Sequence, residues 1–303
     1  MIELEGLVYP TTPPLRGFND EWSKAVYAII GFPFDSTSSY RPGSRFGPAH
    51  IRMASLMIES ISLFTKVDIA RIPMIDLGDL AVVHGNPELT LKRLKEALDV
   101  VISAGKKPVV LGGEHTLTYG VIRALRDKGL TGDDFYLVSL DAHMDLYDEW
   151  PLGQRISHAT VMRRLFELLN ADQLVLLGVR ACDNEELSFA EEYGIDFISS
   201  FELTSQEDAL GELLAALREK HLYLSLDLDV LDPSMAPGVG NPEAGGLSYH
   251  QLLSVLKLII RSAKSLIGFD LVEFNPLMDR SGVTDSVAAR LVYEVLSLDF
   301  TRR

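Results

Sequence analysis

Acidic and imidazole side chains follow the apolar segment Tyr136–Leu140 at intervals of two residues. They are Asp141, His143 and Asp145. If the extended backbone continues through them, alternate side chains share one face, so two carboxylates and an imidazole converge on one point. Oxygen and nitrogen donors gathered in this way can bind a metal ion.

Two other apolar segments end in residues of the same kinds. Leu222–Leu226 is followed by Asp227 and Asp229, again at the spacing that places both carboxylates on one side. Pro108–Leu111 runs into a pair of glycines, which predicts a tight turn, and then reaches His115. Ligands of open parallel sheets bind beyond the carboxyl ends of the strands, so these residues are candidates for a functional site.

These strand ends together carry four aspartates and two histidines, and they predict a metal centre. Unpaired carboxylates in a cleft would repel one another, and a pair of divalent cations removes that repulsion. A carboxylate-rich site with some imidazole suits Mn²⁺ better than Zn²⁺, which takes fewer ligands and often thiolate. We therefore expect two Mn²⁺ ions per chain.

Short apolar segments alternate with longer segments of helical period, which is typical of βαβ units and predicts a mostly parallel sheet with helices on both faces. The strands are predicted at Ala25–Gly31, Pro73–Leu77, Pro108–Leu111, Phe135–Leu140, Leu174–Leu177, Ile195–Ile198, Leu222–Leu226 and Leu266–Phe269. The helices are predicted at Pro48–Glu59, Pro87–Ala104, Thr116–Lys128, Ala159–Leu169, Ser205–Lys220, Tyr249–Ser262 and from Thr284 onward.

The bulk properties indicate a globular protein. A chain of 303 residues can fold around one sheet, so we predict a single domain over residues 1–303. The segments Arg41–Pro48 and Pro233–Gly246 are rich in proline and glycine but too short for linkers, and we expect them to be active-site loops. The single cysteine, Cys182, cannot form an internal disulfide and is expected to be a buried, inert thiol.

Charge and hydropathy argue against two classes of partner. The 28 basic and 43 acidic residues give a net charge of −15, which repels the phosphate backbone of nucleic acids. No apolar run approaches the roughly 18 residues that a membrane-spanning helix needs, and acidic residues stand where a signal peptide would be basic. We expect no nucleic acid or membrane partner and a cytoplasmic location.

Five motifs in this order, GGEH, SLDAHMD, SHAT, SLDLDVLDP and DLVEFNP, resemble the successive motifs of the ureohydrolase (arginase/agmatinase) family. The resemblance spans at least Gly112 to Pro276, and Arg41-Pro42-Gly43 and Gly47-Pro48 resemble the family's N-terminal loop. It implies a single three-layer α/β/α domain on a mostly parallel sheet and a homo-oligomer, a trimer or hexamer. Members that cut agmatine usually have aspartate where this chain has Glu114.

The resemblance also implies a role for each strand-end residue. One Mn²⁺ would be held by His115, Asp141, Asp145 and Asp227, and the other by Asp141, His143, Asp227 and Asp229. Asp141 and Asp227 would bridge the two ions. Two metals can lower the pKa of water towards neutrality, so hydroxide would attack a guanidinium carbon and release urea and an amine.

Two further residues would complete this machinery. A guanidinium has a pKa above about 12 and is cationic near neutral pH, so a carboxylate must bind it. Glu273 matches the family's guanidinium-binding acid. The leaving amine needs a proton, which histidine is suited to move near neutral pH. His158 in the SHAT motif fits the family's proton-shuttling histidine, although Ala159 follows it where glycine is usual. His50, His84, His221 and His250 match no motif and are assigned to structure or surface.

The loop of residues 146–157 is expected to contact the substrate's tail. Arginases have asparagine two residues after the third ligand, where this chain has Tyr147. Asp148 and Glu149 would favour an ammonium tail, as in agmatine. Arg155 could instead bind a carboxylate tail in a bidentate pair. We rank agmatine first among small cationic guanidino substrates, with guanidinobutyrate, guanidinopropionate and arginine as alternatives.

Two readings outside this activity are weaker. A catalytically silent family member could act as a binding or regulatory subunit, but it would be expected to have lost ligands. A one-zinc deacylase of related architecture could use Asp141, His143 and Asp227 alone. Retention of all six ligand residues, with His158 and Glu273, argues against both.

Overall fold

The computed structural model describes residues 4–17, 21–206 and 208–302, and in this part of the chain nine strands form one sheet in the order β1-β3-β2-β4-β9-β8-β5-β6-β7. Neighbouring strands are parallel except at the edge, where β1 is antiparallel to β3. The strands are β1 (Val8–Tyr9), β2 (Tyr27–Phe32), β3 (Met74–Leu80), β4 (Lys107–Gly112), β5 (Phe135–Leu140), β6 (Leu174–Val179), β7 (Asp196–Ser199), β8 (His221–Asp227) and β9 (Ser265–Val272).

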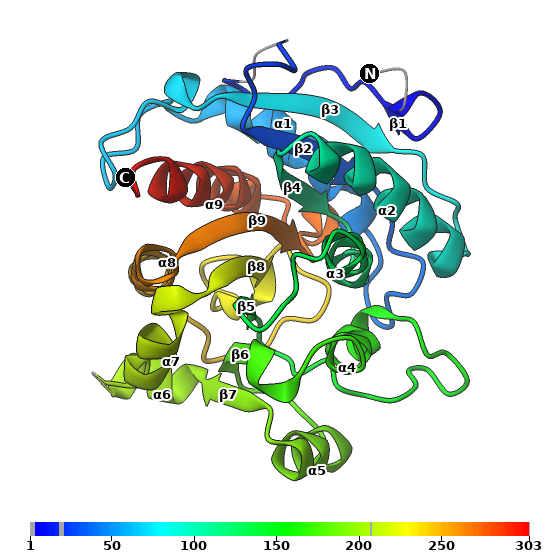
Figure 1. The fold of residues 1–303 in the computed structure, drawn as a ribbon, viewed down its shortest axis with the longest axis vertical. Coiled ribbons are helices and arrows are strands. Elements are labelled where there is room, and N and C mark those ends of the chain that lie inside the picture. Colours follow the sequence, from blue (N-terminus) through cyan, green and yellow to red (C-terminus); the bar gives the residue numbers. More distant parts are fainter. Residues whose placement is uncertain (1–3, 18–20, 207, 303) are drawn as a thin grey trace.

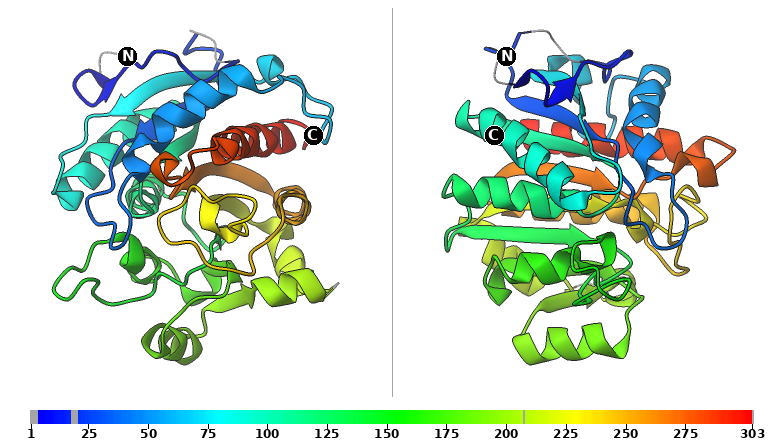
Figure 2. Two further views of the ribbon diagram at one scale, coloured as in Figure 1. Left: turned by 180° about the vertical axis from the view of Figure 1, so that it is seen from behind. Right: turned by 90° about the vertical axis from the view of Figure 1, so that its right-hand side faces the viewer.

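Helices cover both faces of this sheet, which makes the three-layer α/β/α architecture (Figures 1 and 2). Helices α2, α3, α4 and α5 pack on one face, and α1, α7, α8 and α9 pack on the other. The α-helices are α1 (Gly47–Met57), α2 (Pro87–Ser103), α3 (Leu117–Asp127), α4 (Val161–Phe166), α5 (Asn184–Tyr193), α6 (Ser200–Ser205), α7 (Gly211–Ala216), α8 (Tyr249–Ser262) and α9 (Val283–Phe300). None of the helices in the described part of the chain is both long and apolar enough to span a membrane.

Each central strand contributes to two hydrophobic cores because its side chains alternate between the faces. In β2, which is buried along its whole length, Ala28 and Ile30 pack towards α2 and α3, whereas Tyr27 and Ile29 pack towards α1 and α9. Strands covered on both faces read as continuous apolar runs, which is why the sequence shows them so clearly. Burying one large apolar side chain contributes about 1.5–3 kcal/mol before the entropy of ordering it is subtracted.

The register of four adjacent strands, β4, β9, β8 and β5, places their carboxyl ends at one level of the sheet. Leu111 of β4 pairs with Leu271 of β9, and Leu226 of β8 pairs with both Leu271 and Leu140 of β5. Residues that follow these strands must therefore emerge side by side. The candidate site is built at this edge.

The predicted fold class is confirmed, with several corrections to its elements. Helix α5 and strand β1 were not predicted. The single helix expected over Ser205–Lys220 is wrong: α6 ends at Ser205 and α7 covers Gly211–Ala216, with residue 207 outside the described part. Helix α6 starts before the predicted range, at Ser200, because Ser199 and Glu202 form a capping box. Helix α4 is also shorter than expected and follows a 3-10 turn at His158–Thr160.

Candidate metal centre and active site

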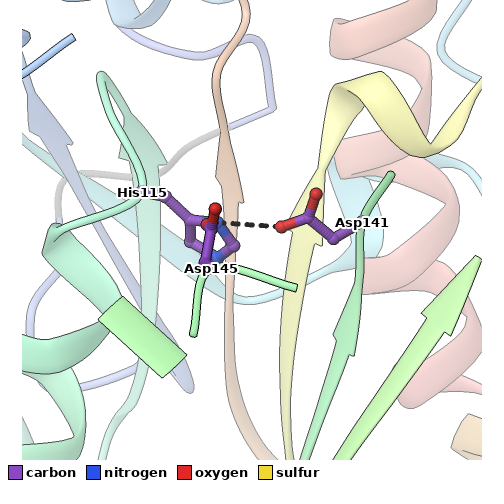
Figure 3. Close-up of side chains that lie close together, drawn as sticks. All are labelled: His115, Asp141 and Asp145. Atoms are coloured by element: carbon purple, nitrogen blue, oxygen red, sulfur yellow. Dashed lines mark ion pairs between the residues drawn. The ribbon is translucent and has the colours of Figure 1, made fainter. Parts of the chain in front are cut away.

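The imidazole of His115, which follows β4, lies among carboxylates from the ends of β5 and β8. Its Nδ1 is 3.0 Å from Oδ2 of Asp145 and 3.1 Å from Oδ2 of Asp141. The same nitrogen is 3.5 Å from Oδ2 of Asp227. Figure 3 shows His115, Asp141 and Asp145 pointing toward one another. Residues separated by more than a hundred positions thus meet at one point, as the strand-end pattern predicted.

A second group of donors surrounds His143. Its Nδ1 is 3.0 Å from Oδ2 of Asp229 and 3.5 Å from Oδ1 of Asp141. Two sets of side chains could therefore hold a metal ion: His115 with Asp141 and Asp145, and His143 with Asp141 and Asp229. Asp141 belongs to both sets. Asp227 borders the first set through its contact with His115.

Tight turns, and not continued strands, bring these side chains together. After β5 the chain leaves the extended conformation, and Asp145 has a left-handed backbone with φ of 53°. Asp227 ends β8, and a 3-10 turn over Leu228–Val230 then carries Asp229. Extended backbone through the whole motif, the condition under which convergence was predicted, is not met at Asp145, although the side chains converge. A left-handed residue other than glycine costs about 1–3 kcal/mol and is typical of functional sites.

The environment of His115 tests whether a metal ion fits this site. Nδ1 of His115 and Oδ2 of Asp141 are buried and lie 3.1 Å apart. Neither atom has a hydrogen-bond partner in the described part of the chain. The other ring nitrogen, Nε2, contacts the Ser225 hydroxyl at 2.9 Å, and that hydroxyl donates to Asp270 at 2.7 Å. This arrangement places the ring proton on Nε2 and leaves the lone pair of Nδ1 for a metal ion. The donor set fits.

The charges of these groups are unbalanced without a cation. Burial opposes a charge on His143, yet the carboxylates of Asp229 and Asp141 raise its pKa to about 12. Burial and the nearby charge of Asp141 raise the pKa of Asp145 to about 6. Burial and the carboxylates of Asp229 and Asp141 also raise the pKa of Asp227 well above its ordinary range. Divalent cations would relieve this crowding of negative charge.

Glu273, which follows β9, lies beside the metal-binding sets. It also has a left-handed backbone, with φ of 60°, and its Oε1 accepts the backbone N–H of His115 at 2.8 Å. Burial and the charge of Glu114 raise its pKa well above the ordinary range.

The turn that carries His115 requires glycine, because a Cβ on Gly113 would lie 2.1 Å from the carbonyl oxygen of Phe34.

His158 lies beside the same carboxylate. Its Nδ1 is 4.0 Å from Oε1 of Glu273, and its Nε2 accepts the backbone N–H of Ser39 at 3.2 Å. Burial and the positive charge of His143 lower the pKa of His158 to about 4. The ring is therefore neutral near pH 7. A neutral imidazole beside a buried carboxylate can accept and return a proton.

A cavity of about 450 Å³ connects these residues to solvent. The side chains that line it include those of His143, Asp145, His158, Asp227, Asp229 and Glu273. The exposed or partly exposed residues of the lining, which we call the outer wall, include Tyr147, Trp150, Arg180, Cys182, Asp183 and Glu243, and the buried Glu186 also lines the cavity. Glu243 comes from the segment Pro233–Gly246, one of the two expected active-site loops. The other expected loop, Arg41–Pro48, contributes no lining residue, but Ser39, two residues before it, lines the cavity.

The residues expected to contact the substrate's tail are placed differently from the prediction. Asp148 pairs with Arg164 at 2.6 Å, Arg155 pairs with Glu167 at 3.1 Å, and Glu149 accepts the backbone N–H of Gly153 at 2.9 Å. None of the three predicted residues, all of them described, lines the cavity. Arg164 of α4, Glu167 after α4 and a backbone N–H of the loop satisfy them instead.

Residues that follow β6 form the outer wall and were missed. Arg180, Cys182 and Asp183 come directly after a buried apolar strand, so the strand-end rule could have found them. Cys182 is exposed and lines the cavity, which corrects the expectation of a buried thiol, because it lies in the loop before α5 and not in a core element.

Comparison with known proteins decides the family. The family model described as "Arginase family" matches residues 25–297. The chain belongs to the arginase family. It is 37% identical to an agmatinase of Bacillus subtilis (strain 168) over 276 residues, which cover 91% of this chain and 92% of that protein. It is 39% identical to an N(1)-aminopropylagmatine ureohydrolase of Thermococcus kodakarensis over 277 residues, 90% of each chain.

A solved structure agrees with this assignment. The agmatine ureohydrolase of Thermoplasma volcanium matches 99% of this chain and 98% of its own with a TM-score of 0.85 and 32% identity. Membership of the family makes this chain a metal-dependent hydrolase of linear amidine C–N bonds, an agmatinase-like ureohydrolase.

Proposed function

We propose that this arginase-family hydrolase converts agmatine to putrescine and urea with two Mn²⁺ ions per chain. The observation that carries the proposal is the charge of the cavity. Its lining holds the buried carboxylate of Glu273, and its outer wall holds Asp183 and Glu243. A substrate with a cationic group at each end matches this distribution of charge.

The proposed metal ligands are the strand-end residues. One ion would be held by His115, Asp141, Asp145 and Asp227, and the other by Asp141, His143, Asp227 and Asp229. Two bound metal ions supply a hydroxide nucleophile near neutral pH. Manganese is favoured over zinc because carboxylate oxygens predominate and no thiolate belongs to either set.

Glu273 and His158 would serve the organic substrate. Glu273 would pair with the guanidinium. The positive charge of the substrate would then offset the burial that raises the pKa of Glu273. His158 is neutral at rest, so Nε2, which lies 3.0 Å from the Ser39 hydroxyl, can take up a proton while Nδ1 gives its own proton to the leaving amine. Its contact with Glu273, at 4.0 Å from Nδ1 to Oε1, places it next to the bound guanidinium.

The outer wall favours an ammonium tail over a carboxylate tail. Arg180 is the only arginine or lysine among the described residues that line the cavity, and its guanidinium donates to the carbonyl oxygens of Asp229 at 2.6 Å and Glu243 at 2.9 Å. It is therefore not free to bind a carboxylate. Tyr147 and Trp150 stack with ring centroids 4.9 Å apart and present aromatic surface, which attracts cations.

The test is a urea-release assay of the manganese-loaded protein with agmatine, arginine, guanidinobutyrate, guanidinopropionate and N1-aminopropylagmatine. We expect the highest kcat/KM with agmatine. A higher value with a guanidino acid would overturn the proposed tail preference. Absence of urea with every compound would overturn the proposed activity.

Asp183→Asn should raise the KM for agmatine about two- to fivefold with little change in kcat. Asp183 is exposed at the cavity wall, where an ion pair contributes about 0.2–1 kcal/mol. Steady-state kinetics at low ionic strength would measure this, since salt screens exposed charges. The matched control is Asp133→Asn, an exposed carboxylate outside the cavity lining, which should leave the KM unchanged.

Manganese should stabilise the folded protein. Binding to the folded state alone at a free concentration of about 100 times Kd adds about 2.7 kcal/mol per site to the free energy of unfolding. Thermal unfolding of chelator-treated protein with and without Mn²⁺ should therefore show a rise in Tm. The Asp141→Asn variant, altered at the residue that both sets share, should show a much smaller rise. An equal rise in both proteins would place the bound ions elsewhere.

A further inference from the structure

Glu114 is a buried carboxylate that the proposed reaction does not use. Its side chain is inaccessible to solvent, and hydroxyl and amide groups, not cations, satisfy its oxygens in the described part of the chain. Oε2 accepts the backbone N–H of Thr37 at 2.7 Å, and Oε1 accepts the hydroxyls of Thr37 at 2.6 Å and Thr116 at 2.8 Å. Burying a carboxylate is costly unless such bonds compensate it, so this network specifies the position of Thr37.

Thr37 connects that carboxylate to His158. The Thr37 hydroxyl, which donates to Glu114, accepts the backbone N–H of His158 at 3.1 Å. Two residues further along, the backbone N–H of Ser39 donates to Nε2 of His158 at 3.2 Å, and the Ser39 hydroxyl lies 3.0 Å from the same nitrogen. One short segment therefore holds both the backbone and the ring of His158.

These contacts also select one tautomer of the neutral ring. A backbone N–H can only donate, so Nε2 of His158 must accept from Ser39 and the ring proton lies on Nδ1. Nδ1 is the nitrogen that faces Glu273. The segment that Glu114 anchors thus turns the protonated nitrogen toward the place where the guanidinium is proposed to bind.

We propose that Glu114 and Thr37 are positioning residues that hold the ring of His158 in its working orientation. Neither side chain lines the cavity, so both act through His158 and not on the substrate. The inference rests on the proposed function, because it assigns His158 the transfer of a proton to the leaving amine. It also predicts the Nδ1–H tautomer of the resting ring, and this prediction does not depend on the substrate.

The first test compares Thr37→Val, which removes the hydroxyl and keeps the shape of the side chain, with Thr37→Ser, which keeps the hydroxyl. With the wild type's best guanidino substrate, Thr37→Val should lose about 10- to 100-fold in kcat, since a displacement of about 1 Å can cost about 10²-fold. KM and metal content should not change. Thr37→Ser should restore most of kcat. Wild-type kcat in Thr37→Val would overturn the proposal.

A double-mutant cycle separates positioning from a general loss of structure. If Thr37 acts through His158, adding Thr37→Val to His158→Ala should cause little further loss of kcat. An equal loss with and without His158 would show that Thr37 acts independently of that ring, and it would contradict the proposal.

The second test needs no turnover and so separates this inference from the proposed function. In metal-free protein labelled with ¹⁵N-histidine, the ring signals of His158, assigned by their absence from His158→Ala, should show the Nδ1–H tautomer. In Thr37→Val they should move toward a mixture of tautomers. Signals of the Nε2–H tautomer in the wild type, or identical signals in Thr37→Val, would overturn the positioning role even if the wild type releases urea. If the wild type releases no urea but shows the expected signals, the positioning of the ring would be supported and the proposed function overturned.

Discussion

Replacing Asp227 with alanine should abolish urea release and lower the affinity for both proposed metal ions. The Asp227 carboxylate lies 3.5 Å from His115, and burial together with Asp229 and Asp141 raises its pKa well above the ordinary range. Removing a proposed bridging ligand should cost more than the roughly 10- to 100-fold in metal affinity that an outer-shell partner costs. Metal analysis and urea release on the same preparation would measure both effects.

Asp229→Ala is the matched comparison. Its Oδ2 is 3.0 Å from Nδ1 of His143, and it belongs to only one of the two metal-binding sets. We expect this variant to weaken mainly one ion. If both variants kept full metal and full activity, the proposed ligands would be wrong.

Replacing His158 with alanine should separate rate from metal binding. The expected loss in kcat is about 10²–10⁴-fold, the usual contribution of a general acid or base. Metal content and KM should remain close to those of the wild type, because His158 belongs to neither metal-binding set. Its nearest acidic partner is Glu273, at 4.0 Å. Steady-state kinetics together with metal analysis would measure both quantities.

Two outcomes would contradict this role. Loss of manganese from His158→Ala would make the residue a ligand. An unchanged kcat would leave it without a part in proton transfer, and Glu273 would then be the nearest group able to move a proton. His84→Ala is a suitable control, because this histidine does not line the cavity.

The convergence of the strand-end residues could be predicted from the sequence because it depends on few variables. Side chains alternate along a strand, and parallel strands all end at one edge of the sheet. Apolar runs before His115, Asp141 and Asp227 therefore predicted that these residues emerge at the same edge of the sheet. The order of the strands was not predicted, and it completes the convergence by making β4, β9, β8 and β5 consecutive.

The finer geometry could not be predicted because contacts remote in sequence decide it. The left-handed backbones of Asp145 and Glu273 carry a local cost that only the folded surroundings can offset. The acids of the loop 146–157 were assigned to the substrate's tail, but Arg164 neutralises Asp148 from α4. A sequence pattern shows that a charge exists and does not show its partner.

Helix α5 was missed for a local reason. Acidic residues fill most of its exposed face, and only Glu186, Phe189 and Ala190 are buried, so its apolar stripe is too narrow to show a helical period. Strand β1 is two residues long and offers no alternation to detect. The omission of α5 hid part of the cavity lining, since Asp183 and Glu186 belong to the start of this helix.

The most direct test of the two-metal proposal is urea release from agmatine measured against the amount of manganese bound per chain. Chelator-treated protein would be loaded stepwise, and bound metal would be determined on each sample before the assay. We expect activity to rise until about two Mn²⁺ ions are bound per chain and then to stop rising, as a two-metal mechanism requires. Full activity with one bound ion, or with none, would contradict it.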